Sequence, residues 1–445
     1  MRIAFVPIDN RPVCYTLPKL ISEIDEDFEL VLPDRTDLGD LTKNANIENI
    51  FTWLKGLNNL DGMILAFDTL AYGGLIPSRR CPETFSQIQK RVEELKEILL
   101  EKKCRILAVS SIMRISNNNY NEEEKTYWSE YGKKIFTYSY NFHKNGEEKC
   151  SDIPQEILDD YIKTRTRNFE INKIYLEWQK EGLLDTLVFS KDDCAEFGLN
   201  VMEAQELESL GGYTKTGADE IPLSLLSRVI GKQMKVCPVF LEPEYKNLIS
   251  NYEDVRIENS VKGQRELANC IIADEKNADG ILYINNFKHH QGEIVMKIDT
   301  EGFDRSFAAP NKPYMIADVR FANGADNNFV KELFKNKIID KNFYGYSAWN
   351  TSANSLGSLI LCAKMKIFAK KYNQNAFEKV QLTRFLDDWA YQANVRQKLK
   401  SPEKNILAKE MKSFEKVLED VTLNSVNVKY SFPWKRLFEV EIEFS

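Results

Sequence analysis

Histidine and paired cysteines are scarce in this chain of 445 residues. The three histidines are His143, His289 and His290, and none has HExxH or another metal-ligand spacing. The eight cysteines are scattered without a CxxC pair, so we interpret them as reduced core residues. A histidine-based triad and a cysteine–histidine zinc site are therefore not expected. Any acid–base chemistry should run on carboxylates, amides and arginines.

Long apolar runs and an excess of positive charge are also missing. No run approaches the roughly 18 residues of a membrane span, and the first expected strand begins at Ile3 without a signal-peptide layout. Lys and Arg number 60 against 67 Asp and Glu, a net charge of −7. Neither nucleic acid nor a membrane is expected as a partner. A P-loop and a GxGxxG turn are absent, so no nucleotide cofactor is expected. We predict a cytoplasmic protein, and a homo-oligomer is compatible with the sequence.

Short β-branched or aromatic runs alternate with helical segments over most of the chain. Helices such as Thr84–Lys102 and Pro154–Glu181 separate most of the runs. Alternation of this kind predicts an α/β fold with parallel strands joined by right-handed crossovers. The expected strands are Ile3–Val6, Glu29–Leu32, Gly62–Ala66, Arg105–Val109, Thr186–Phe189, Pro238–Leu241, Gly280–Ile284, Tyr314–Ala317 and Tyr344–Ser347.

Two arrangements of these strands compete. A (β/α)8-barrel-like fold with one extra strand is favoured. The alternative is two doubly wound domains, the second starting near residue 233, with Val255–Ile257 as a further strand. In either case residues 1–368 form the α/β catalytic domain, with a possible division near 233. The polar, Tyr-rich segment 117–152 is interpreted as a lid or an oligomer contact.

Residues 369–445 have a different pattern. Long helices are expected over 375–400 and 402–420, followed by two alternating runs, Asn427–Ser431 and Leu437–Phe444. We interpret this part as a C-terminal helical and β-ribbon appendage with a structural role.

Two adjacent aspartates, Asp192 and Asp193, follow the strand expected at Thr186–Phe189. A strand that ends in two carboxylates places both near the rim of a sheet, where α/β proteins build active sites. Two carboxyl groups that lie so close to each other resist being ionised at the same time, so one can hold its proton near neutral pH. Such a pair can act as acid and base. A solvated loop or a helix cap is the plain alternative.

Polar residues also follow the other expected strands. One such ending is explained by turn chemistry, but seven would converge on a single rim in a barrel. Such a lining suits a polyhydroxylated ligand, and aromatic rings there can stack on a sugar. Asn350 and Asn354, four residues apart, are expected to share one helix face. The residues at these strand ends are Asp9, Arg11, Asp68, Tyr72, Arg114, Asn285, Asn286, Asp318, Arg320, Asn323, Asp326, Trp349, Asn350 and Asn354.

The long helix before the aspartate pair adds two candidate binding residues. Arg165 and Asn168 are three residues apart and share a face, although a solvated face explains them equally well. Asp and Glu in Gly217–Glu220 begin another helix, where the dipole favours them. A divalent metal would suit the carboxylates if they converge, although no spacing demands one. These carboxylates are Asp9, Asp68, Asp192, Asp193 and Asp318.

Several stretches match a known family pattern in order over residues 1–360. They are Val6–Val13, Asp68–Arg79, Ile112–Ile115, Arg165–Asn168, Asp192-Asp193, Gly217–Glu220, Asn323–Asp326 and Trp349–Gly357. On these residues the chain resembles a bacterial family of unknown function, domain of unknown function 4127. Asn10 stands where a second acidic residue is expected. The resemblance implies no activity.

A weaker likeness concerns mechanism. Asp192-Asp193, the cluster from Asp318 to Asp326, and the turn from Trp349 to Asn354 are similar in order to hexosaminidases of glycoside hydrolase family 84. Those enzymes are barrels with an Asp-Asp pair at a strand end. The likeness implies that Asp193 is the general acid and that Asp192 orients a substrate acetamido group, roles that could be exchanged.

We therefore predict a carboxylate-dependent glycoside hydrolase, acting on an N-acetylated amino sugar with substrate assistance. The residues expected to hold sugar hydroxyls are Asp68, Arg114, Asp318, Asn323, Asp326, Asn350 and Asn354. One alternative is a divalent-metal-dependent hydrolase that uses Asp9, Asp68 and Asp192. Another is a non-catalytic sugar- or polyol-binding protein, which two doubly wound domains would favour.

Overall fold

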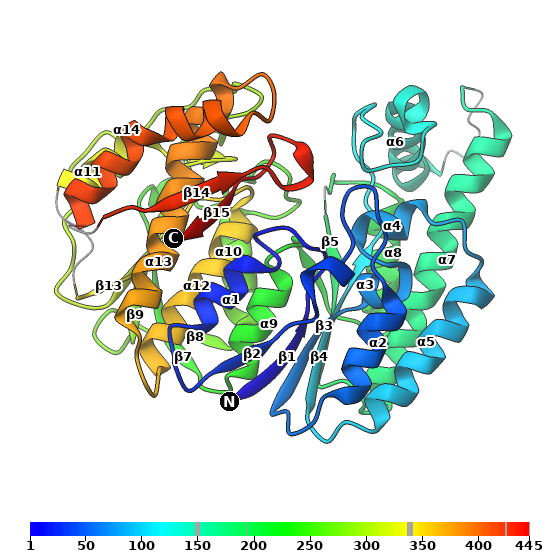
Figure 1. Ribbon diagram of the computed structural model, residues 1–445. Helices are drawn as coiled ribbons and strands as arrows, with labels where there is room; N and C mark the ends of the chain where they lie inside the picture. The colour runs from blue at the N-terminus through cyan, green and yellow to red at the C-terminus, as the bar shows by residue number, and fades with distance from the viewer. Residues whose placement is uncertain (147–151, 193, 336–340, 423–424, 445) are drawn as a thin grey trace. The chain divides into compact units, whose positions relative to one another are not determined.

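Two compact units make up the chain in a computed structural model that describes residues 1–146, 152–192, 194–335, 341–422 and 425–444 (Figure 1). Unit 1 comprises residues 1–10, 30–225 and 252–254, and unit 2 comprises residues 11–29, 226–251 and 255–445. Residues 369–445 fall within unit 2.

Unit 1 contains a six-stranded sheet in the order β2-β1-β3-β4-β5-β6. β3 pairs in parallel with β1 and β4, and β5 pairs in parallel with β4 and β6. Every residue of β3 is buried, which explains why this strand is one continuous apolar run. The strands are β1 (Arg2–Val6), β2 (Glu29–Val31), β3 (Gly62–Ala66), β4 (Arg105–Ile112), β5 (Thr186–Lys191) and β6 (Thr214–Thr216).

Helices connect the strands of this sheet. The helices α5 and α7 lie where the sequence predicts Thr84–Lys102 and Pro154–Glu181. Thr84 Oγ1 accepts a hydrogen bond from the Gln87 amide, and Gln87 Oε1 accepts one from the Thr84 amide, a capping box before α5. The helices are α2 (Ile47–Gly56), α3 (Phe67–Tyr72), α4 (Leu75–Arg80), α5 (Phe85–Leu100), α6 (Trp128–Asn145), α7 (Gln155–Lys180) and α8 (Leu199–Ser209), while α9 (Ile221–Val229) runs from unit 1 into unit 2.

The Tyr-rich excursion contains the helix α6, which makes its own apolar contacts. Trp128 and Ile135 of α6 pack with Met113 and Ile115, which follow β4, and with Tyr161 of α7. All five side chains are buried. Because this cluster lies beyond the end of β4, it fixes the excursion next to the carboxyl end of that strand.

Unit 2 contains a five-stranded parallel sheet in the order β13-β11-β9-β7-β8. Helices α10 (Ile257–Leu267) and α12 (Ser352–Phe368) contribute Ile257 and Leu356 to a buried cluster with Val236 and Met315 of the sheet. The strands are β7 (Met234–Phe240), β8 (Cys270–Ile272), β9 (Gly280–Asn285), β11 (Tyr314–Asp318) and β13 (Phe343–Ser347).

The parallel strands of the described residues alternate with helices, as predicted for an α/β fold. The first five expected strands belong to unit 1 and the other four to unit 2. The further strand expected at Val255–Ile257 is wrong. Arg256 forms only an isolated bridge with Ile249, and Ile257 is the first residue of α10. The buried positions Ile257, Ser260, Val261 and Gln264 of α10 recur with the period of a helix.

The C-terminal part follows the predicted order of helices and then an antiparallel β-ribbon. It contains α13 (Gln374–Arg384), the π-helix η3 (Phe385–Val395), the short η4 (Arg396–Lys398), α14 (Lys404–Thr422), β14 (Val428–Ser431) and β15 (Glu441–Phe444). β14 and β15 are the red arrows of Figure 1. Among the helices described here, none has both the length and the apolar character that a bilayer crossing requires.

Candidate functional site

The carboxyl edge of the sheet in unit 1 carries several of the predicted site residues. Asp68 lies in the first turn of α3 directly after β3, Arg114 follows β4, and Asp192 follows β5. Ile112 pairs with Lys191 in the β4–β5 register, so the residues after these two strands leave the sheet side by side. Asp9 follows β1 and is buried. Asp193 lies outside the described residues.

Asp68 is a buried carboxyl group with an altered proton affinity. Its Oδ2 accepts a hydrogen bond of 2.8 Å from the Ser111 amide of β4. Burial raises the pKa of Asp68 to about 6, against the opposing effects of the Ser111 hydrogen bonds and of the Arg79 guanidinium. Asp68 therefore changes its charge close to physiological pH, as a general acid or base must.

Two arginines connect Asp68 with Asp192. Arg114 Nη1 forms an ion pair with Asp192 Oδ2 at 3.4 Å. Arg79 of α4 is 2% exposed, and burial, followed by the neighbouring charge of Arg114, lowers its pKa. Asp192 also acts on Arg79 electrostatically. These four charged groups therefore form one electrostatic cluster at the carboxyl edge of the sheet.

Glu123 and Glu124 complete this cluster, and sequence reasoning missed both of them. Arg114 contacts Glu124 through Nε and Glu123 through Nη2, each at 3.0 Å. Arg79 contacts the same two carboxylates at 3.3 and 3.5 Å. The Nε and Nη2 atoms of Arg79 nevertheless have no hydrogen-bond partner in the described residues. The missed signal was an acidic pair inside the excursion that follows Arg114.

Arg165 and Asn168 of α7 are engaged in contacts within the protein. Arg165 bonds Tyr161 Oη at 3.0 Å and the Met113 carbonyl at 2.5 Å, and pairs with Glu203. Asn168 donates to the Ser78 carbonyl at 2.9 Å. Asn168 thus satisfies a carbonyl in the last turn of α4, and Arg165 joins α7 to the residues after β4. These contacts favour a positioning role for both residues.

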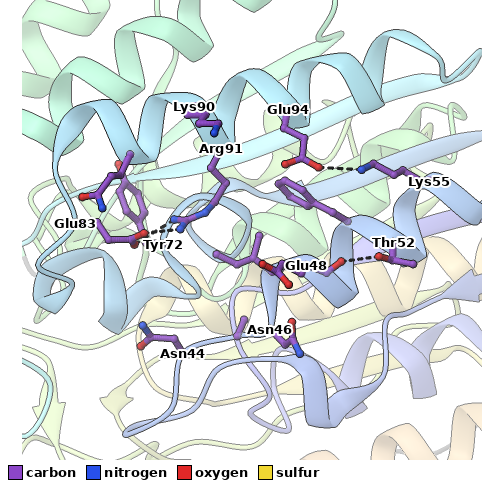
Figure 2. A pocket seen from close by; sticks show the side chains of 14 residues that line it. Asn44, Asn46, Glu48, Thr52, Lys55, Tyr72, Glu83, Lys90, Arg91 and Glu94 are labelled. Atoms are coloured by element: carbon purple, nitrogen blue, oxygen red, sulfur yellow. Dashed lines mark hydrogen bonds and ion pairs between the residues drawn. The ribbon is translucent and has the colours of Figure 1, made fainter.

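Tyr72 has a different setting from the one expected. It lines a polar groove of about 800 Å³, whose other residues come mainly from the 44–46 loop, α2 and α5 (Figure 2). Arg167 lies over the ring of Tyr72, 5.4 Å from its centroid. The Tyr72 hydroxyl is buried and has no hydrogen-bond partner in the described part of the chain. The ion pairs Arg91–Glu83 and Lys55–Glu94 join side chains that line the groove.

The backbone geometry of the turn after Tyr72 explains why glycine stands at position 73. Gly73 ends α3 in the left-handed region with φ of 88°, and its amide bonds the Thr69 carbonyl. A Cβ on Gly73 would lie 2.9 Å from Asn44 Cβ. The turn leads into α4, and Arg79 of this helix acts electrostatically on Asp68.

A second buried carboxyl of unit 1 lies in the stretch Gly217–Glu220. Burial raises the pKa of Glu220 to about 8, and Glu220 Oε2 accepts from the Ala218 amide at 3.1 Å. A favourable interaction with the dipole of α9 does not require Glu220 to be buried. The sequence interpretation explained Glu220 by this interaction alone and therefore missed its burial. Its neighbours Asp219 and Glu253 raise the pKa further.

A metal centre receives no geometric support in the described residues. No group of three or more His, Cys, Asp and Glu side chains among them is arranged to hold a metal ion. The set Asp9, Asp68 and Asp192 therefore does not form such a group.

Asp318 of unit 2 is fully enclosed by hydrogen-bond donors. Its Oδ1 accepts from Asn285 Nδ2 at 2.8 Å, and its Oδ2 accepts from Tyr346 Oη at 2.8 Å and from the Asp326 amide at 2.9 Å. Burial, followed by the charge of Asp326, raises the pKa of Asp318 to about 7. A carboxyl with this many internal donors holds β9, β11 and β13 together, which favours a structural role over contact with a sugar.

Asp326 and Arg320 extend this internal network. Asp326 accepts from the Phe303 amide at 2.6 Å and from the Asn328 amide at 2.9 Å. Arg320 is 0% exposed and contacts Asn285, Glu242 and the Glu301 carbonyl at 2.8–3.1 Å. Asp326 therefore also has a positioning role.

The asparagines that follow β11 and β13 are brought together. Asn323 and Asn350 both have left-handed backbones, with φ of 60° and 57°, and the Asn323 amide donates to the Asn350 carbonyl at 2.8 Å. Asn323 Nδ2 also bonds Glu293 Oε1 at 2.5 Å. The expected sharing of a helix face by Asn350 and Asn354 is wrong, because Thr351 caps α12 and Asn350 lies outside it.

Trp349 and Arg11 contact the C-terminal part of the chain. The Trp349 ring meets Phe438 edge-on, with centroids 6.3 Å apart. Arg11 Nη1 pairs with Glu439 at 3.3 Å. The predicted residues are therefore divided between two clusters, one in each unit, and the second includes residues of the appendage that sequence reasoning assigned to structure alone.

Comparison with known proteins identifies the family. A search of curated proteins finds no match. The family model described as "Protein of unknown function (DUF4127)" matches residues 3–443, nearly the whole chain, as the shared motifs predicted. The chain belongs to this family of proteins of unknown function.

Proposed function

We propose that this protein is a carboxylate-dependent glycoside hydrolase whose reacting groups lie at the carboxyl edge of unit 1. The observation that carries the proposal is the pairing of two unlike carboxyl groups in one cluster. Asp68 is buried with a pKa of about 6, while Asp192 is ion-paired with Arg114. Glycosidic cleavage uses such a pair, one carboxyl that carries a proton and one that is ionised.

In this proposal Asp68 protonates the leaving oxygen and Asp192 stabilises the reacting sugar. This differs from the sequence expectation, in which Asp193 is the acid, because Asp68 lies in the same cluster as Asp192 and its pKa of about 6 suits a proton donor. Arg114 holds Asp192 in position. An N-acetylated amino sugar remains the preferred substrate class, with Asp192 orienting the acetamido group.

Asp192→Asn is expected to lower kcat/KM at least about 100-fold, a loss typical of removing one electrostatic contact to the transition state. The assay measures release of nitrophenol from a panel of nitrophenyl glycosides that includes N-acetylhexosaminides. Asp185→Asn is the matched control. Asp185 lies just before β5 and bonds the Ile106 amide and Arg105, so this variant should keep full activity. Equal activity of both variants and the wild type on a cleaved glycoside would contradict the proposal.

A non-catalytic sugar-binding protein is the second candidate. The grouping of the strands in two separate sheets favours it, because that arrangement is the one expected for such proteins. Saturable binding of a sugar by calorimetry, with no product released over a day at high protein concentration, would select this candidate.

A further inference from the structure

A row of alternating arginine and aromatic side chains lies in unit 2. Arg11 and Arg436 both lie over the Trp434 ring, at 5.4 and 4.5 Å from its centroid. Arg436 and Arg396 both lie over the Phe438 ring, at 4.9 and 5.3 Å. We call these five side chains the arginine–aromatic row. Stacking on a ring restrains a guanidinium while its N–H groups still point sideways.

The segment that carries the row is held in a costly conformation. Trp434 and Lys435, between β14 and β15, both have φ of 54°, a left-handed backbone that bulky residues rarely adopt and that costs about 1–3 kcal/mol each. The π-helix η3 anchors this segment. Tyr391 Oη donates to the Leu437 carbonyl at 2.6 Å, and Gln392 Nε2 donates to the Phe438 carbonyl at 3.1 Å. Strain and π-helical turns both gather at functional sites.

Charged groups of both signs lie along the row. Arg11 pairs with the buried Glu439, and Glu293, Asp387 and Glu439 act on Arg396. Arg436 and the exposed Lys435 add two further cations on the solvent side. Trp434, Arg436, Phe438 and Arg396 are each partly exposed, so a ligand can reach them.

The row continues the cluster of predicted residues in unit 2. Phe438 contacts the Trp349 ring, and Trp349 precedes Asn350, whose carbonyl accepts from Asn323. Asn323 bonds Glu293, which in turn acts on Arg396. Arginines, aromatic rings and amides are therefore joined in one chain of contacts within this unit.

We infer that the arginine–aromatic row binds the anionic group of a carbohydrate, that is, a carboxylate, phosphate or sulfate carried on the sugar. Planar guanidinium groups match such anions with paired hydrogen bonds, and the exposed ring edges offer apolar contact to the sugar. The carbohydrate part of this inference rests on the proposed function, whereas the anion is argued from the row alone.

The test is binding of the full chain to small sugars by isothermal titration calorimetry. The probes are glucuronate, galacturonate, N-acetylneuraminate, glucose 6-phosphate and N-acetylglucosamine 6-sulfate, with glucose, galactose and N-acetylglucosamine as neutral counterparts. At least one anionic sugar should bind at least about tenfold more tightly than its neutral counterpart. Arg436→Gln should weaken that binding about tenfold or more, and Arg436→Lys should restore only part of it.

Lys429→Gln is the matched control. Lys429 is exposed on β14 and faces Glu443 of β15, so this variant removes the same charge from the same ribbon without touching the row. Four results would overturn the inference: no anionic sugar binds, neutral sugars bind equally well, both variants weaken binding equally, or inorganic phosphate alone binds as tightly as every anionic sugar. Because binding is measured without turnover, absence of hydrolysis with intact selective binding would refute only the proposed function.

Discussion

Asp68→Asn is expected to lower kcat about a thousandfold and, at the same time, to raise the free energy of unfolding near neutral pH. The loss of activity follows from the proposed role, since removing a positioned proton donor typically costs about 10²- to 10⁴-fold. Asparagine keeps the oxygen that accepts from the Ser111 amide but has no proton to give. In the wild type, activity should fall as the pH rises above about 6, where Asp68 loses its proton.

The gain in stability follows from the direction of the pKa shift. Burial raises the pKa of Asp68 from 3.8 to about 6, so the folded state holds this proton over a pH range in which the unfolded chain has lost it. The stability that the proton supports is complete below about pH 4 and is lost as the pH rises to about 6. A shift of about two units corresponds to about 3 kcal/mol. Asparagine avoids this loss, so a gain of about 1–3 kcal/mol is expected at pH 8.

Urea unfolding of both proteins at several pH values checks this expectation. The difference in unfolding free energy should grow between pH 4 and 6 and stay constant above pH 6. Other buried carboxyls with raised pKa values, such as Glu203, Glu220 and Asp388, are present in both proteins and cancel in the difference. A variant that is less stable than the wild type at pH 8 would indicate that Asp68 is a structural anion, and the proposed acid would then be wrong.

The longer strands could be predicted because their apolar runs are visible in the local sequence, whereas the two- and three-residue strands β6, β8, β10 (Gly292–Glu293) and β12 (Phe321–Ala322) are not among the expected ones. Gly62–Ala66 is a run of buried residues on a central strand, and its observed bounds are the predicted ones. Pro238–Leu241 was placed too late, because β7 begins at Met234 and alternates buried Met234 and Val236 with exposed Lys235. At Val255–Ile257 a short β-branched run was mistaken for a strand. Three residues carry too little periodicity to separate the start of a helix from a strand.

In the candidate site, only the residues that directly follow strands could be predicted from the sequence. Asp68, Arg114 and Asp192 follow adjacent parallel strands, so their neighbourhood could be inferred. Glu123 and Glu124 reach the same place from a long excursion, and no local pattern encodes such a contact. Asp318 was expected to face a ligand, yet three internal donors enclose its oxygens. Polar residues at strand ends therefore serve both as ligand contacts and as internal braces, and only the contacts distinguish the two.

Arg320→Leu is the second variant with a large expected effect. It tests whether the polar residues at the strand ends of unit 2 are internal braces or ligand contacts. Arg320 is fully buried and contacts Glu242 at 2.8 Å, Asn285 at 3.1 Å and Asp326 at 3.5 Å. Leucine removes the buried cation beside the Asp326 carboxylate and leaves Glu242 with only its contact to the half-exposed Arg305. Breaking a buried pair in this way typically costs about 3–5 kcal/mol, so the free energy of unfolding should fall by about that amount in urea titrations.

Arg305→Leu supplies the comparison, because Arg305 contacts the same Glu242 carboxylate at 3.3 Å but its side chain is 46% exposed. Exposed pairs contribute about 0–1 kcal/mol, so this variant should unfold nearly as the wild type does. Similar losses in the two variants would mean that Arg320 adds nothing beyond an exposed pair. Asp318 and Asp326 would then not be internal braces. These residues at the carboxyl edge of unit 2 would instead be candidates for direct contact with a sugar. A large loss for Arg320→Leu alone would mean that this edge of unit 2 is held by internal contacts of the fold.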